Sequence, residues 1–158
     1  MKAIIRSLYF KTLVELTKIF HFEMAHAIHG YEGACKNIHG HSYELHVTVS
    51  ARERRDDEYI PAPGLIFDFR ELKQLVTESI VKRVDHKLVL SQNHITAHQG
   101  ICTKENLVVL AAEPTAENLL IYIKRILSEK LPLTVQLTEL KLYETKDSFA
   151  KWVNGNRR

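Results

Sequence analysis

Apolar and polar residues alternate along two segments near the start of the chain, residues 12 to 25 and residues 41 to 52. Side chains two positions apart leave the same side of an extended strand, so each segment predicts a half-buried β-strand. Only Lys18 interrupts the alternation of the first strand, whose apolar phase continues to His26. The apolar phases of the two predicted strands are Phe20, Phe22 and Met24, followed by Tyr43, Leu45, Val47 and Val49.

Two later segments carry apolar residues at helical spacing. Asp68 is the expected N-cap of the first helix, with Glu71 as the reciprocal partner of a capping box, and this helix is expected to end near Arg83. Thr115 is the expected N-cap of the second helix, and Pro132 closes it. The two apolar stripes are Leu72, Leu75, Val76 and Ile80, then Leu119, Leu120, Ile123, Ile126 and Leu127.

Two final strands are predicted at residues 133 to 144 and 148 to 153, joined by a turn at Lys146 and Asp147. The order strand, strand, helix, helix, strand, strand predicts an α+β fold, with a four-stranded antiparallel sheet and both helices on one face. The length suits one domain, so we expect residues 1–158 to form a single unit. The other face of the sheet needs cover, which a partner subunit could supply.

The segment from residue 87 to residue 113 is harder to interpret. Turn signals interrupt it, and Leu107 to Leu110 form a candidate short strand. His94, His98 and Cys102 lie in this segment, where exposed loop residues are the expected interpretation. A second metal site is the alternative, but we see no spacing among these residues that is typical of a ligand set.

Composition and charge exclude several classes of function. The net charge is only +3, and the densest charged run, residues 52 to 58, mixes both signs, so nucleic-acid binding is not indicated. No apolar run is long enough to span a membrane, and residues 1 to 10 lack the features of a signal peptide. Two cysteines make no disulfide framework, so we expect a cytoplasmic protein with free thiols.

Three histidines are in phase with the predicted strands. His39 and His41 open the apolar face of the second strand, and His26 ends the apolar face of the first. If the strands are neighbours, the three imidazoles converge at one end of the sheet, as in a catalytic zinc site. Copper, iron or nickel would suit the same ligands, and a hydrogen-bonded core histidine is the alternative for each ring. His46 has the opposite phase and is expected to face solvent.

Four more residues are candidates for a functional role, and each also has a simpler structural interpretation. Cys35 precedes the histidine pair and could instead be a small buried residue. Asp85 and His86 follow the first helix and could act as an acid/base pair or as a helix-terminal cap. Glu144 ends the apolar face of a strand, which is costly for an unpaired buried carboxylate but ordinary for one in water.

Six motifs in this order resemble the 6-pyruvoyl-tetrahydropterin synthase / 6-carboxytetrahydropterin synthase family, over nearly the whole chain. Each motif is weak alone, and the ordered set is highly specific. The motifs are Phe22-x-x-Ala25-His26, Cys35-x-x-x-His39-Gly40-His41, Gly64-Leu65-Ile66-x-Asp68-Phe69, Asp85-His86, Pro114-Thr115-x-Glu117-Asn118 and Glu144-Thr145.

The resemblance implies the tunnelling fold, in which subunits join their sheets into a barrel. It implies a homohexamer of two stacked trimers, with active sites at subunit interfaces. It also implies zinc on the three histidines, Cys35 as catalytic base helped by Asp85 and His86, and Glu144 as the anchor of the pterin ring. Thr115 and Glu117 would also contact the ring, with helix capping as the alternative for both.

Three residues separate Cys35 from His39, which looks like the 6-carboxytetrahydropterin synthase branch of the queuosine pathway. The implied enzyme is a lyase that converts 7,8-dihydroneopterin triphosphate to 6-carboxy-5,6,7,8-tetrahydropterin, losing acetaldehyde and triphosphate. A synthase that forms 6-pyruvoyltetrahydropterin is one alternative, and a non-catalytic pterin-binding homologue with a structural metal is another. The segment 87 to 113 is longer than compact family members use, and Met24 stands where many have alanine.

Overall fold

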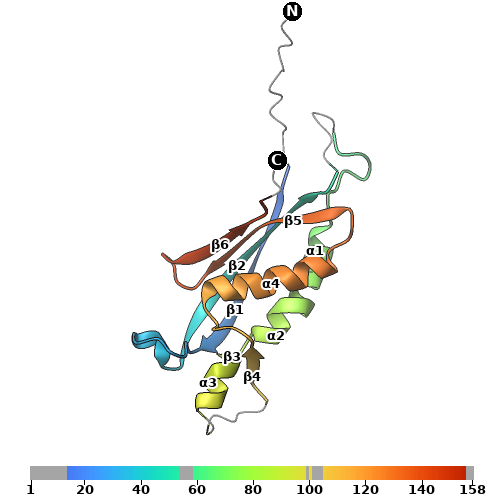
Figure 1. Ribbon diagram of the computed structural model, residues 1–158. Helices are drawn as coiled ribbons and strands as arrows, with labels where there is room; N and C mark the ends of the chain where they lie inside the picture. Colours follow the sequence, from blue (N-terminus) through green and yellow to red (C-terminus); the bar gives the residue numbers. More distant parts are fainter. Residues whose placement is uncertain (1–13, 54–58, 99, 101–104, 156–158) are drawn as a thin grey trace, which may run out of the picture.

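A curled six-stranded sheet organises the computed structural model, which describes residues 14–53, 59–98, 100 and 105–155 (Figure 1). The strand order is β4-β3-β1-β2-β5-β6. The strands β1, β2, β5 and β6 pair antiparallel, whereas β3 pairs parallel with both β1 and β4. The strands are β1 (Leu16–His26), β2 (His39–Ala51), β3 (Lys87–Ser91), β4 (Leu107–Leu110), β5 (Val135–Tyr143) and β6 (Phe149–Val153).

The ladder between β1 and β2 is the longest in the sheet. It runs without a break from the pair Leu16 and Val49 to the pair His26 and His39. This register places the apolar phases of both strands on one face, where they meet the helices. The first predicted strand began at residue 12, and residues 12 and 13 lie outside the described part of the chain.

The predicted α+β class is confirmed, but the sheet contains two parallel strands beyond the four antiparallel ones that we predicted. Leu107 to Leu110 form β4, as expected for a short strand, whereas β3 was not predicted at all. A parallel partner comes from a distant part of the chain, so no local turn signal marks it. The sheet is therefore mixed, with β3 and β4 extending it beyond β1.

Helices cover one face of this sheet (Figure 1). The first comprises α1 (Phe69–Val76), a π-helical segment η2 (Thr77–Val81) and α2 (Lys82–Val84). The Asp68 side chain accepts a hydrogen bond from Arg70 N, which confirms the predicted N-cap, but Glu71 makes no reciprocal bond to Asp68 among the described residues. The second is α4 (Ala116–Lys130), capped by Thr115, whose Oγ1 accepts from Asn118 N.

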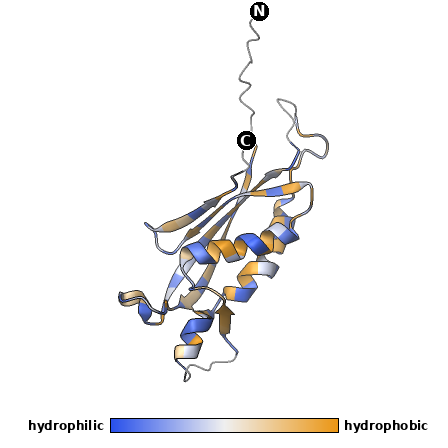
Figure 2. Ribbon diagram, viewed as in Figure 1, coloured by the Kyte–Doolittle hydropathy of each residue, from blue (hydrophilic) through white to orange (hydrophobic). Residues whose placement is uncertain are grey.

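The core lies between this face of the sheet and the helices. Hydrophobic and hydrophilic residues alternate along the strands, and α4 carries both kinds around its surface (Figure 2). The most enclosed side chains come from β1, β2, the helices α1, η2 and α4, and β5. These side chains include Phe22, Met24, Tyr43, Leu45, Val47, Leu72, Ile80, Leu120, Ile123, Leu127, Leu140 and Leu142. None of the described helices has the length and apolar character needed to cross a membrane.

Two short helices complete the described part of the chain. The 3-10 turn η1 (Ala34–Lys36) lies between β1 and β2 and carries Cys35. The helix α3 (Gln92–Ala97) follows β3 directly, and its N-cap Ser91 accepts a hydrogen bond from His94 N. This helix replaces the exposed loop that we expected around residues 92 to 98.

Candidate metal centre and its surroundings

Three histidines converge where β1 ends and β2 begins. His26 pairs with His39 in the β1–β2 ladder, and His41 lies two residues further along β2. One ligand nitrogen from each ring lies within 4.8 Å of the other two. The sheet register thus brings together His26, His39 and His41, as their phase predicted.

Backbone carbonyls fix the tautomer of two of these rings. Nδ1 of His26 lies 2.7 Å from the Pro114 carbonyl oxygen, and Nδ1 of His39 lies 2.8 Å from the Asn37 carbonyl oxygen. A carbonyl only accepts, so each Nδ1 must carry the proton and donate it. Both Nε2 atoms then carry lone pairs in the neutral rings, which is the arrangement that metal ligation requires.

His26 Nε2 and His39 Nε2 lie 3.1 Å apart, which is hydrogen-bond distance. Because neither atom carries a proton, their lone pairs repel each other. Burial is the main reason that the pKa of His26 is lowered, and the neighbouring His39 and His41 act in the same direction. The neutral form of His26 is therefore favoured. A cation bound between these nitrogens would turn their repulsion into attraction, so the residues present fit a metal ion.

A carboxylate and a phenol complete the inner surface of this cluster. Glu144 follows β5, and its Oε1 lies 3.4 Å from His26 Nε2 and 3.8 Å from His41 Nε2. The Tyr43 hydroxyl donates to the same Oε1 at 3.1 Å. Burial and then the Glu144 charge raise the pKa of Tyr43, so the phenol stays protonated as a donor. Glu144 is thus paired, unlike the free strand-end carboxylate of our alternative.

Tyr43 is a site residue that sequence reasoning assigned only to the core. It is 1% exposed and stacks on Phe22, so the core assignment is also correct. The available signal was its spacing, because it follows His41 by two residues on the same face. His46 lies on the opposite face as expected, where its Nε2 is 2.6 Å from Glu44 Oε1, although its side chain is only 20% exposed.

Cys35 lies in η1, the turn between the two strands that carry the histidine cluster. Its carbonyl oxygen accepts a hydrogen bond from Ile28 N at 2.9 Å, which ties the turn to the end of β1. The thiol is free and half-buried, so Cys35 is not the small core residue of our alternative interpretation. Burial and the Glu144 charge are the main causes that raise the pKa of Tyr43, and Cys35 adds a smaller electrostatic contribution.

Asp85 and His86 form a pair at the start of β3. The carboxylate Oδ1 of Asp85 lies 3.0 Å from His86 Nδ1 and accepts from the Glu23 backbone N–H at 2.9 Å. This backbone hydrogen bond is the main cause that lowers the pKa of Asp85. Adjacent residues rarely pair directly through their side chains. Such pairing is possible here because His86 has a positive φ of 56°, with its N–H bonded to the Glu23 carbonyl oxygen.

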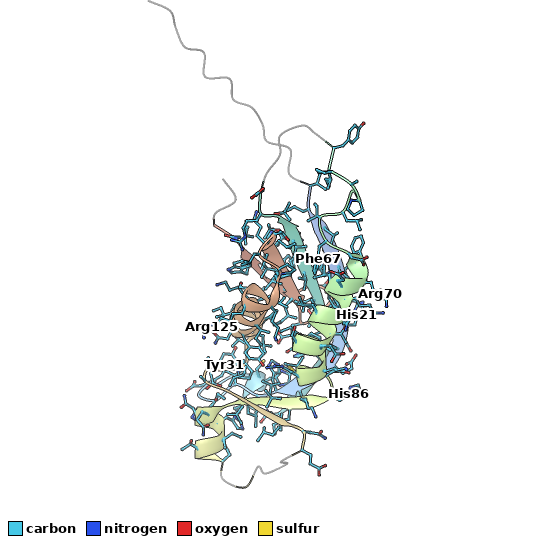
Figure 3. All side chains as sticks on the ribbon, turned by 90° about the vertical axis from the view of Figure 1, so that its right-hand side faces the viewer. His21, Tyr31, Phe67, Arg70, His86 and Arg125 are labelled. Atoms are coloured by element: carbon cyan, nitrogen blue, oxygen red, sulfur yellow. The ribbon has the colours of Figure 1, made fainter. Side chains whose placement is uncertain are left out.

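The Asp85–His86 pair faces outward and not toward the cluster of His26, His39 and His41 in the same chain. The His86 side chain is 79% exposed and lies at the periphery of the molecule (Figure 3). His86 and His41 line one open cavity of about 480 Å³, together with Glu23 and Ser42. Among the described residues, no hydrogen bond or ion pair joins Asp85 or His86 to Cys35 or to the three histidines.

The start of α4 reaches the cluster through Pro114. Its carbonyl holds His26, whereas Thr115 acts as the helix cap. Glu117 lies in the first turn of α4, where its carboxylate interacts favourably with the positive end of the helix dipole. The supporting carbonyls of Pro114 and Asn37 carry no side-chain signal, so the sequence could not indicate them.

A second group of histidines lies outside this cluster. His29, His94 and His98 each offer a ring nitrogen within 4.8 Å of the other two. The expectation that His94 is an exposed loop residue is wrong, because its side chain is 3% exposed in α3. The missed signal is the four-residue spacing of His94 and His98, which places both on one side of a helix. Cys102 lies outside the described residues.

Known proteins share this sequence pattern and this fold. The family model described as 6-pyruvoyl tetrahydropterin synthase matches residues 15–154. A 6-carboxy-5,6,7,8-tetrahydropterin synthase of Rickettsia typhi is 31% identical over 143 residues, which cover 88% of this chain and 99% of that protein. A 6-pyruvoyl tetrahydrobiopterin synthase of Dictyostelium discoideum is also 31% identical, over 74% of this chain and 71% of that protein.

Solved structures agree on the fold. The 6-pyruvoyltetrahydropterin synthase of Plasmodium vivax, in a catalytic-residue mutant, superimposes with a TM-score of 0.69 at 20% identity. The match covers 90% of this chain and 98% of that one. The fold is therefore the tunnelling fold that the motifs implied. With a family model that spans most of its length, the chain belongs to the 6-pyruvoyl tetrahydropterin synthase family.

Proposed function

We propose that this protein is a zinc-dependent 6-carboxy-5,6,7,8-tetrahydropterin synthase, a cytoplasmic lyase of queuosine biosynthesis. It converts 7,8-dihydroneopterin triphosphate and one water to 6-carboxytetrahydropterin, acetaldehyde and triphosphate. The observation that carries the proposal is the close approach of His26 Nε2 and His39 Nε2, both held as acceptors. The three-residue spacing from Cys35 to His39 and the relative named for this activity favour the carboxy-forming branch.

His26, His39 and His41 are the residues that would hold the zinc ion. When bound, the zinc supplies positive charge that attracts the vicinal hydroxyl oxygens of the substrate side chain and favours their ionised forms. The carbonyls of Pro114 and Asn37 keep two of the rings in the ligating tautomer.

Cys35 is the proposed base that removes a carbon-bound proton from the substrate side chain. Its thiol is free and half-buried, and it precedes His39 by four residues. Asp85 holds Nδ1 of His86, which leaves Nε2 of that ring to receive or deliver a proton. This pair is exposed and does not contact the three-histidine cluster of its own chain. We therefore propose that it contributes to the active site of a neighbouring subunit in a homohexamer.

Glu144 is the proposed anchor of the pterin ring. Two carboxylate oxygens match the adjacent N–H donors on the pyrimidine edge of a pterin. The Tyr43 hydroxyl occupies one lone pair of Oε1 and so fixes the orientation of the carboxylate. Thr115 and Glu117 begin the helix whose preceding residue, Pro114, holds His26, and we propose that they border the ring.

Product identification tests the proposal directly. Purified protein with zinc is incubated with 7,8-dihydroneopterin triphosphate, and the products are identified by mass spectrometry with acetaldehyde measured separately. We expect 6-carboxytetrahydropterin and acetaldehyde in equal amounts. Formation of 6-pyruvoyltetrahydropterin without acetaldehyde would support the other branch, which the Dictyostelium relative represents. No turnover of the substrate, despite its binding, would favour a non-catalytic pterin-binding homologue.

Two variants separate the chemical roles. We expect Cys35→Ala to keep its zinc and its fold but to lose turnover, whereas Cys102→Ala, at the other cysteine of the chain, keeps turnover. His39→Ala should lose one zinc per chain together with activity, while His21→Ala, at an exposed histidine on the opposite face, loses neither. Full activity in Cys35→Ala would remove the thiol from the mechanism.

A further inference from the structure

A second cluster of imidazoles lies just beyond the end of β1. His29 follows that strand, and His94 and His98 come from α3 and its C-cap. The ring centroids of His94 and His98 lie 4.5 Å apart, and those of His29 lie 6.1 and 5.9 Å from them. Residues more than sixty positions apart in the sequence thus bring their rings together.

His94 is a buried polar residue whose ring nitrogens lack hydrogen-bond partners in the described part of the chain. Its side chain is 3% exposed. Buried polar groups in proteins are nearly always paired, because an unpaired one costs free energy. A buried imidazole without a partner among the described residues therefore lies within reach of two other histidine nitrogens.

His98 is held in a ligating form by its own helix. Its Nδ1 lies 3.1 Å from the carbonyl oxygen of His94, so Nδ1 donates and Nε2 keeps its lone pair. The support has the same form as that of His26 and His39 in the first cluster. Two histidines four apart on a helix also form a recurring half of zinc sites.

A carboxylate lies next to this second cluster. Glu113 Oε2 accepts a hydrogen bond from the His29 backbone N–H at 2.8 Å, which fixes the segment that carries His29. The negative charge of Glu113 also raises the pKa of His94, against the larger effect of burial. A nearby negative charge compensates the charge of a divalent cation.

We propose that His29, His94 and His98 bind a second zinc ion, with the Glu113 carboxylate near the site as a charge partner. The site is separate from the His26, His39 and His41 cluster and shares no ligand with it. The ion would give one of the two buried nitrogens of His94 a partner and would join α3 to the end of β1.

Counting zinc per chain in matched variants tests this site. The whole protein and each variant are purified with zinc, dialysed against metal-free buffer, and analysed by inductively coupled plasma mass spectrometry. We expect two zinc ions per chain in the wild type, one in His94→Ala and one in His98→Ala. His39→Ala should also hold one, the combined His39→Ala and His98→Ala variant none, and the surface control His21→Ala two.

His98 provides the decisive variant, because it is exposed at a helix end and its replacement should not prevent folding. The proposal is overturned if His98→Ala and His29→Ala both keep the zinc content of the wild type. Loss of one zinc in His98→Ala alongside unchanged zinc in His39→Ala would support this site and contradict the first one. Cobalt substitution, followed by the visible d–d absorption of each variant, gives a second readout that does not depend on activity.

Discussion

Replacement of Tyr43 by phenylalanine removes one hydroxyl group and leaves the ring in place. The ring is 1% exposed and stacks on Phe22 with centroids 5.3 Å apart, so packing should survive the change. The lost interactions are the hydrogen bond to Glu144 Oε1 at 3.1 Å and a longer contact to His26 Nε2 at 3.5 Å. Tyr43→Phe therefore measures mainly the contribution of one charged hydrogen bond beside the histidine cluster.

The magnitude follows from the environment of the two groups. A hydrogen bond to a charged group contributes about 1.5 to 3 kcal/mol of net stability. Here the bond is longer than a strong O–H···O⁻ contact, and Glu144 is 29% exposed, so water can partly replace the phenol. We expect the free energy of unfolding to fall by about 1 to 2 kcal/mol.

Urea unfolding at pH 7 and fixed protein concentration measures this loss, with Tyr122→Phe on α4 as the matched control. The Tyr122 hydroxyl has no hydrogen bond among the described residues, so its removal should change stability by less than about 0.5 kcal/mol. A double-mutant cycle of Tyr43→Phe with Glu144→Ala should give a coupling energy of about 1 kcal/mol. Equal effects of the two tyrosine variants, or no coupling, would refute the assignment.

Two further predictions concern the core and the pH dependence. Leu45→Ala, at a fully buried site on β2, should lower the free energy of unfolding by about 2 to 5 kcal/mol, as measured in urea, whereas Leu133→Ala at an 86% exposed site should change it little. The lowered pKa of Asp85 contributes stability that is present above the unfolded value of about 3.9 and is lost as pH falls through the folded value. The stability difference between wild type and Asp85→Asn should therefore shrink between pH 7 and pH 3, and a difference that grows on acidification would contradict this sign.

The part of the sheet built from local patterns was predictable. The phases of β1 and β2 determine which face is buried, and a register shift by one residue would expose every apolar side chain. The same phase places the three histidines at one end, because each continues an apolar row. The helix caps at Asp68 and Thr115 followed from residue type and position.

Distant and backbone contacts were not predictable in the same way. The strand β3 is only five residues long and pairs in parallel with β1, more than sixty residues earlier. The carbonyls that support His26 and His39 belong to Pro114 and Asn37, and any residue type offers a carbonyl. His94 is buried by the packing of α3, which its own short and mostly polar sequence does not indicate.

The two histidine clusters meet at a single dipeptide. The Pro114 carbonyl fixes Nδ1 of His26, and the preceding carboxylate of Glu113 binds the N–H of His29. Asn118 Nδ2 donates to the Glu113 carbonyl oxygen and ties the same dipeptide to α4. The Glu113–Pro114 peptide plane contains the Glu113 carbonyl but not the Pro114 carbonyl, so a rotation of the Glu113 side chain alone does not move the group that holds His26. A change in occupancy at His29, His94 and His98 would therefore reach the ring orientation of His26 only if it moved the backbone of Glu113 and Pro114 together.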